Sequence, residues 1–290
     1  MKALAIDGGG IRGLIPALVL AEIERRTGRR MATMVDVIAG TSTGAIIACA
    51  LARPNPMAAA RIAEVYTVDG PKIFDRSLVK TVTSADGFLD ELYDDAPLVA
   101  SLRTHLGDGR VADATAKLLI TAYDLQARSE LLLGGDVSLV DAAHASSAAP
   151  TYFEPVRLGN RTLIDGGVGA INPSLYAYAE AGGKPTLLLS LGTGSQTKPL
   201  PYDEVKDWGK LQWAEPILDV VFDASTDAVD SQLDRLIDGA YIRLQTPLTE
   251  ASPDLDDASE ENLAALRREA EKLIADQSAA IDRACALLTA

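Results

Sequence analysis

Two short stretches near the start of the chain constrain the fold most. Each is an apolar run that ends in a glycine-framed turn and leads directly into an apolar helical stretch. Short apolar runs bounded by glycine turns are typical of buried strands, whereas longer apolar runs with helical spacing favour helices. The predicted elements are, in order, a strand over 3–7, a helix over 14–26, a strand over 34–39 and a helix over 43–52.

The same alternation continues along the chain and predicts an α/β fold. A helical but irregular section runs to about residue 110, and a final amphipathic helix is expected near 259–288. Alternating strands and helices of this kind indicate a mostly parallel sheet with helices on both faces. The remaining predicted elements are a strand over 117–122, a helix near 139–147, a strand before Asp165, a helix over 173–181 and a strand over 185–191.

Ligands of such sheets bind beyond the carboxyl ends of the strands. Asp7, Ser42, Asp165 and Thr193 all follow predicted strands. We therefore expect these four side chains to gather at one edge of the sheet.

The second turn, GTSTG at residues 40–44, has the form of a nucleophile elbow. Ser42 stands between a predicted strand and a predicted helix, and Gly40 and Gly44 flank it. Glycine is needed on both sides because the turn is sharp and its neighbours pack closely, and the helix N-terminus favours developing negative charge. Ser42 is therefore the candidate nucleophile.

The first turn, DGGGIRG at residues 7–13, allows two interpretations. Gly8, Gly10 and Gly13 satisfy the G-x-G-x-x-G pattern of a dinucleotide site. Such a site needs an acidic residue at the end of the second strand, but Asp36 lies in the middle of that strand. Three consecutive glycines followed by Arg12 instead predict a concave set of N–H groups beside a cation, which suits an oxyanion next to a nucleophilic serine.

The chain contains two histidines, and neither has the context of a catalytic base. His105 lies in a polar stretch, and His144 lies in an alanine-rich helical stretch. A triad histidine of an α/β-hydrolase would follow a strand late in the chain. Asp165 follows a short apolar strand and precedes Gly166 and Gly167, which let another backbone approach it, so it is the better candidate base.

Composition limits the partners and the compartment. The formal charge of −14 argues against nucleic acid and against anionic lipid, so membrane contact should be apolar. No apolar run approaches the ~18 residues that span a bilayer, and no signal-like segment opens the sequence, so we expect a cytoplasmic or signal-stripped protein that can associate with membranes transiently. Cys49 and Cys285 are expected to be reduced, and no Cys/His cluster has metal-ligand spacing.

Taken together, these motifs resemble those of the patatin-like phospholipases, or lipid acyl hydrolases. The two glycine turns match the family's oxyanion and serine motifs, and DGG at 165–167 matches its second dyad motif. The resemblance extends over the full length, although residues 66–110 follow the family pattern loosely. Further matching segments stand in order at 145–153, 172–173, 190–194 and 255–263.

The resemblance implies a three-layer α/β/α fold related to the cytosolic phospholipase A2 catalytic domains. It implies one catalytic domain over 1–290, with a core over about 1–200, a lid or cap over 66–110 and a helical part over 204–290. Ser42 would attack an ester carbonyl and Asp165 would take its proton, without metal or cofactor. The oxyanion hole would comprise Gly8, Gly9, Gly10 and Arg12, with the motif supported by Gly40, Gly44, Gly166 and Gly167.

The implied activity is hydrolysis of carboxylic esters of lipids, in lipid or membrane aggregates, through an acyl-serine intermediate. Three alternatives remain open at this stage. The same site could belong to a phospholipase effector that a ligand or partner activates, or to a storage or binding protein with incidental esterase activity. An acyl-enzyme is also common to acyltransferases.

Overall fold

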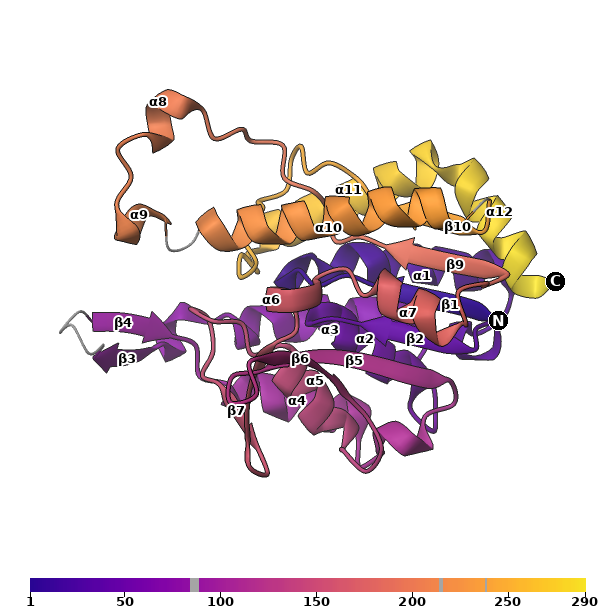
Figure 1. Cartoon of the computed structure of the whole chain (residues 1–290), viewed down its shortest axis with the longest axis horizontal. Helices are drawn as coiled ribbons and strands as arrows, with labels where there is room; N and C mark the ends of the chain where they lie inside the picture. Colours follow the sequence, from indigo (N-terminus) through magenta and orange to yellow (C-terminus); the bar gives the residue numbers. More distant parts are fainter. Residues whose placement is uncertain (84–88, 214–215, 238) are drawn as a thin grey trace.

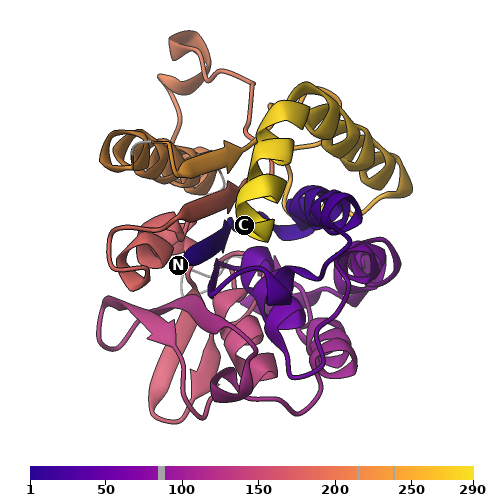
Figure 2. The same cartoon turned by 90° about the vertical axis from the view of Figure 1, so that its right-hand side faces the viewer.

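A computed structural model describes residues 1–83, 89–213, 216–237 and 239–290. The main sheet has the strand order β10-β9-β1-β2-β5-β8-β7, and β6 also pairs with β5. Helices cover both faces of this sheet (Figures 1 and 2). The predicted fold class, a three-layer α/β/α arrangement around a mostly parallel sheet, is confirmed.

The strands are short and the helices vary widely in length. The strands are β1 (Lys2–Ile6), β2 (Val37–Gly40), β3 (Lys80–Thr83), β4 (Leu89–Leu92), β5 (Lys117–Asp124), β6 (Ser129–Leu133), β7 (Val156–Leu158), β8 (Arg161–Asp165), β9 (Leu187–Leu191) and β10 (Tyr241–Leu244). The α-helices are α1 (Leu14–Thr27), α2 (Thr43–Ala52), α3 (Ala59–Ile73), α4 (Ala96–Leu106), α5 (Leu139–Ser146), α6 (Gly167–Ala170), α7 (Ser174–Glu180), α8 (Tyr202–Val205), α9 (Lys210–Trp213), α10 (Pro216–Leu236), α11 (Glu260–Asp276) and α12 (Ser278–Thr289).

The sequence of β1 explains how the two helical layers differ. Successive side chains of a strand point to opposite faces of the sheet. Leu4 and Ile6 join the larger hydrophobic cluster, to which α1 and α2 contribute. Ala3 and Ala5 join a smaller cluster with residues of α7 and α10. Both faces of β1 are therefore buried, as its continuous apolar sequence predicts.

β6 and β8 run antiparallel to β5, which the simple alternation of strands and helices does not predict. β1, β2, β5, β9 and β10 are mutually parallel, but β8 pairs antiparallel with β5 and also antiparallel with β7. β7 and β8 are joined by a short connection, which suits an antiparallel pair, because parallel strands need a long crossover. Asp165 therefore reaches the site from the opposite direction to Ser42.

Other elements depart from the sequence-based expectations. Residues 66–110, expected to be helical, include the antiparallel pair β3 and β4, although residues 84–88 of the expected lid lie outside the described residues. Residues 204–290, expected to be helical, also supply the sheet strand β10; residues 214–215 and 238 of this part are likewise outside the description. The final helix is two helices, α11 and α12, which meet at Gln277. Within the described ranges, no helix is long and apolar enough to cross a membrane.

The packing of α10 on the sheet leads to a stability prediction. Leu233 is fully buried in the smaller cluster, whereas Leu236 on the same helix is 57% exposed. We expect Leu233→Ala to lower the free energy of unfolding by about 2–5 kcal/mol, because it leaves a cavity. Leu236→Ala should change it by less than about 0.5 kcal/mol. Urea denaturation of both variants measures the difference, and equal losses would contradict this packing.

Candidate active site

The turn between β2 and α2 holds Ser42 in a strained backbone conformation. Ser42 has φ 55° and ψ −121°, a region that residues other than glycine rarely adopt. Its N–H donates to the Ser146 hydroxyl at 2.9 Å. A Cβ atom at Gly44 would fall on the backbone carbonyl of Ile6, so the close approach of α2 to β1 requires glycine there. This geometry is that of a nucleophile elbow.

Strand β5 brings the two candidate dyad residues together. Residues 122–124 of β5 pair with both β6 and β8, so these two strands lie on opposite edges of β5. Ile120 likewise pairs with both β6 and β2, so β2 lies on the same edge of β5 as β8. β2 ends at Gly40, which pairs with Ile120, and β8 ends at Asp165, which pairs with Ala122. The carboxyl ends of β2 and β8 thus face each other across two residues of β5, about 7 Å along the strand.

The Asp165 carboxylate is buried beside Ser42. It lines the same pocket as Ser42, whose side chain acts as a hydrogen-bond donor that lowers the pKa of Asp165, and the Gly167 N–H donates to its Oδ1 at 2.7 Å. Burial raises the pKa of Asp165 to about 6, against these two hydrogen bonds, which lower it. Asp165 can therefore exist in both protonation states near neutral pH, as a proton acceptor requires.

Hydrogen bonds to the carbonyl oxygens hold two peptide groups of the first glycine turn. The Gly8 carbonyl accepts from the Thr193 hydroxyl at 2.6 Å, and the Gly9 carbonyl accepts from Arg12 N at 3.1 Å and Arg12 Nε at 3.3 Å. A trans peptide directs its N–H opposite to its C=O. The Gly9 and Gly10 N–H groups therefore face away from Thr193 and Arg12, and both glycines line the pocket that contains Ser42.

The Arg12 side chain lies on the other side of this turn. It is buried, and with Thr193 and Asp223 it lines a separate polar cavity. It is not among the described residues that line the Ser42 pocket. The structure thus places Arg12 where it holds the Gly9 peptide, whereas the sequence suggested direct contact of its side chain with an oxyanion.

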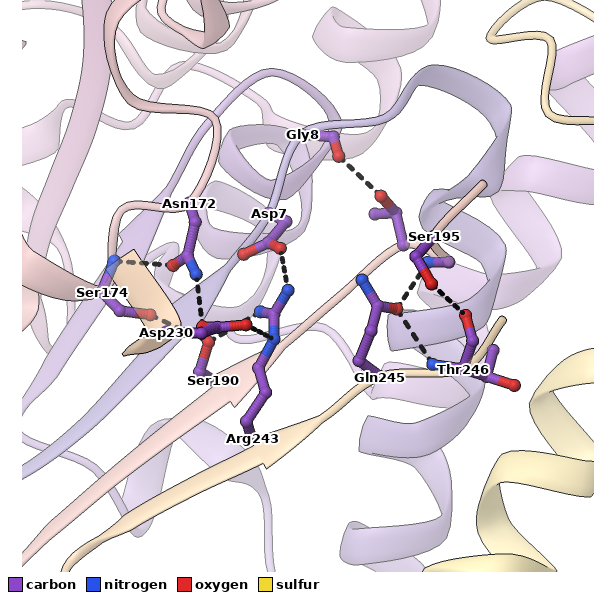
Figure 3. Close-up of polar contacts among 12 residues, drawn as sticks. Asp7, Gly8, Asn172, Ser174, Ser190, Ser195, Asp230, Arg243, Gln245 and Thr246 are labelled. Carbon is purple, nitrogen blue, oxygen red and sulfur yellow. Dashed lines mark hydrogen bonds and ion pairs between the residues drawn. The ribbon is translucent and has the colours of Figure 1, made fainter. Parts of the chain in front are cut away.

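A buried ion pair anchors the start of the first turn. Asp7 Oδ2 lies 2.6 Å from an Arg243 guanidinium nitrogen, and Arg243 Nε lies 3.0 Å from Asp230 Oδ2 (Figure 3). Burial raises the pKa of Asp7 to about 6, although Arg243 acts to lower it. Arg243 comes from β10, so the C-terminal part of the chain fixes the residue that precedes the glycine turn.

The pocket beside Ser42 is almost entirely apolar. Besides Ser42, Asp165 and the two glycines, it is lined largely by aliphatic and aromatic side chains of α2, α3 and α4 and of the segment 147–153. Tyr66 and Phe74, from the stretch expected to cover substrate, are among them. Such a pocket suits an extended hydrocarbon chain better than a polar ligand.

Neither histidine is placed to act on Ser42. His144 Nε2 lies 3.1 Å from Asp95 Oδ2, and His144 does not line the Ser42 pocket. His105 lines the pocket but pairs with Asp69, and its carbonyl accepts from Arg53, which follows the last residue of α2. Ser42 precedes the first residue of α2, so His105 is at the opposite end of that helix.

Potential metal ligands are not clustered in the described ranges. No group of three or more His, Cys, Asp or Glu side chains there could hold a metal ion. Cys49 is buried, and Cys285 is partly buried; both are free.

Comparison with known proteins identifies the family of this fold and site. The sequence model of the patatin-like phospholipase family matches residues 4–178. This chain belongs to the patatin-like phospholipase family. Patatin-like protein 2 of Arabidopsis thaliana is 33% identical over 339 residues, which cover 93% of this chain and 82% of that protein.

Other patatins are similarly related. Probable inactive patatin-3-Kuras 1 of Solanum tuberosum is 31% identical over 331 residues, covering 94% of this chain and 86% of that protein.

Among solved structures, VipD from Legionella pneumophila aligns with a TM-score of 0.47 and 14% identity, covering 95% of this chain and 67% of that one.

Sequence reasoning missed two residues that shape the site of this patatin-like protein. Ser146, interpreted from sequence as a packing or turn residue, accepts the Ser42 N–H. Arg243 was not singled out, although an arginine within the otherwise apolar strand Tyr241–Leu244 signals a buried partner.

The Asp7–Arg243 pair yields a prediction for stability. We expect Arg243→Met to lower the free energy of unfolding by about 3–5 kcal/mol at pH 8, because it leaves the Asp7 carboxylate buried without a counter-charge. The loss should shrink at pH 5, below the pKa of Asp7, since a neutral carboxyl needs no counter-charge. Guanidinium denaturation at both pH values measures this.

The matched control is Arg268→Met. Arg268 forms a 2.7 Å pair with Glu250 in which both side chains are more than half exposed, so its loss should be below about 1 kcal/mol. Equal losses of unfolding free energy in the two variants would show that the Asp7–Arg243 pair does not stabilise the fold.

Proposed function

We propose that this chain is a lipid acyl hydrolase of the phospholipase A or non-specific carboxylic esterase type. Its nucleophile is Ser42, its base is Asp165, and it needs neither metal nor cofactor. One observation carries the proposal: Ser42, on its strained turn, and the buried Asp165 carboxylate line one apolar pocket, which Gly9 and Gly10 also line.

Acylation begins when Ser42 Oγ attacks the ester carbonyl carbon. Asp165 accepts the hydroxyl proton, because a serine is a weak nucleophile unless an adjacent base activates it. The C=O pair of electrons moves to oxygen and creates an oxyanion. The Gly9 and Gly10 N–H groups donate to that oxyanion, and Thr193 and Arg12 hold their peptides in the orientation required before substrate binds.

The tetrahedral intermediate then collapses and the C–O bond to the leaving alcohol breaks. Asp165 returns its proton to the alcohol, leaving an acyl group on Ser42. In the second half, Asp165 takes a proton from water, hydroxide attacks the acyl carbonyl, and the proton returns to Ser42 Oγ as the fatty acid leaves. Both halves use the same base and the same oxyanion donors.

The apolar pocket supports an acyl chain as the group that is transferred. A lipid aggregate is the proposed source of substrate, and contact with it would be apolar because the chain carries a net charge of −14. The name of one potato relative describes it as inactive. The placement of Ser42 and Asp165 in one pocket with Gly9 and Gly10 favours activity over a storage role in this chain.

Substitution of the dyad tests the proposed chemistry. We expect Ser42→Ala and Asp165→Asn each to lower kcat for p-nitrophenyl octanoate by roughly 10³-fold or more, because each removes a group that acts in the transition state. His144→Ala is the control and should retain activity, because His144 pairs with Asp95 outside the pocket. Loss of activity in His144→Ala, or full activity in Asp165→Asn, would mean that the base is assigned wrongly.

The pH dependence gives a further prediction. Asp165 accepts a proton only when ionised, and its pKa is raised to about 6. We therefore expect kcat/KM to rise with pH, about tenfold per unit well below pH 6, and to level off above it. Histidine titrates in the same range, so the profile should be measured in His144→Ala as well. Disappearance of the acid limb in that variant would contradict the assignment.

A further inference from the structure

The Ser42 pocket is a channel that follows helix α2. Ser42, Ile46 and Ala50 line it at intervals of four residues, which places them on one face of the helix. At the helical rise, eight residues extend about 12 Å. The pocket therefore runs from the candidate nucleophile toward the far end of α2.

Helix α4 supplies the facing wall. Leu98, Leu102 and Leu106 are buried, line the pocket, and have the same four-residue spacing as the lining residues of α2. The Arg53 guanidinium, just after α2 ends, donates to the carbonyl of His105. The end of α4 that carries His105 therefore lies at the far end of the channel from Ser42.

A polar cluster that includes Ser101 and His105 interrupts this apolar lining. Asp69 Oδ2 accepts from the Ser101 hydroxyl at 2.8 Å and lies 2.9 Å from His105 Nε2, so α3 is joined to α4. Lys72 Nζ lies 2.9 Å from the other Asp69 oxygen. Burial acts to raise the pKa of Asp69, but hydrogen bonds from Lys72, His105 and Ser101 lower it to about 2, so this carboxylate is charged at neutral pH.

The cluster stands between the channel and a second groove on the outer surface of α3 and α4. Val65, Ser101 and His105 line both spaces. Thr104 and Arg61 line the outer groove but not the channel. The shared residues are thus a thin partition between an apolar interior and a polar surface groove.

We propose that the Asp69–Ser101–His105 cluster closes the channel and sets the longest acyl chain that the site accepts. This inference rests on the proposed function, since it assigns the channel to the acyl group bound to Ser42. Methylene groups gain about fourfold in kcat/KM for each one buried against the apolar walls. At the partition that gain ends, because a longer chain would have to displace the hydrogen bonds of a charged carboxylate.

Chain-length profiles test the proposal. The readout is the ratio of kcat/KM for hexadecanoyl over octanoyl p-nitrophenyl esters. His105→Ala should raise this ratio by about fourfold or more, because loss of the imidazole ring joins the channel to the outer groove. Ser101→Ala should raise it by a smaller factor, because it removes one hydrogen bond of the cluster and creates little space. Ala50→Leu, which narrows the channel near its far end, should lower it by a factor similar to that of His105→Ala.

Thr104→Ala is the matched control on the same helix, and it should leave the ratio within about twofold of wild type. Thermal unfolding identifies variants that fail to fold. If both His105→Ala and Ser101→Ala fold and keep the wild-type ratio, or if Thr104→Ala changes it as much, the proposal is overturned.

Binding measured without turnover separates this proposal from the proposed function. Calorimetric titration of Ser42→Ala with octanoate and hexadecanoate reports the channel alone. If adding His105→Ala to Ser42→Ala raises the affinity for hexadecanoate more than the affinity for octanoate, the partition is supported even if wild type hydrolyses no ester. No change in the relative affinities overturns the partition even if the Ser42–Asp165 chemistry is correct.

Discussion

The candidate site depends on one edge of one strand. β5 is long enough for β2 to pair with its first half and for β8 to pair with its second half along the same edge, from opposite directions. The gap between the two carboxyl ends is where Ser42 and Asp165 meet. Thr121 of β5 donates to Thr41 across this gap at 2.8 Å, and Thr41 donates to the Ala170 carbonyl at 2.6 Å. The elbow is thereby tied to the segment that follows Asp165.

The arrangement has an energetic cost that is consistent with a functional site. Ser42 holds a positive φ, and the Asp7 and Asp165 carboxylates are buried with raised pKa values. Strain and buried charge persist only where the surrounding structure enforces them. Here the enforcing contacts are the Ser146 hydroxyl beside Ser42 and Arg243 beside Asp7.

The sequence alone was sufficient to predict those elements whose structure depends mainly on the residues of the element itself. Short apolar runs and obligatory glycines located β1, β2 and both turns, because the close approach of Gly44 to Ile6 allows no side chain. The candidate residues Ser42 and Asp165 could be named from such motifs. Their mutual geometry could not, because it depends on the antiparallel pairing of β8 with a strand about 40 residues earlier in the chain.

Long-range contacts also explain what the sequence left out. The role of Arg243 can be predicted only when β10 is known to pair with β9. Because β9 in turn pairs with β1, Arg243 comes to lie beside Asp7. The expected single C-terminal helix breaks at Gln277, whose side chain donates to the Gln245 carbonyl at 2.6 Å. No periodicity in the helix itself predicts that bond.

Arg12 was assigned to the correct turn but to the wrong side of it, because the motif does not determine the direction in which its side chain points.

The most direct test of the account is to trap the acyl-enzyme. Protein quenched in acid during turnover of a p-nitrophenyl ester would be digested and its peptides mapped by mass spectrometry. The account predicts an acyl adduct on Ser42 during steady-state hydrolysis and its absence in Ser42→Ala. Hydrolysis that continues in Ser42→Ala, or an adduct on a different residue of the wild-type protein, would contradict it.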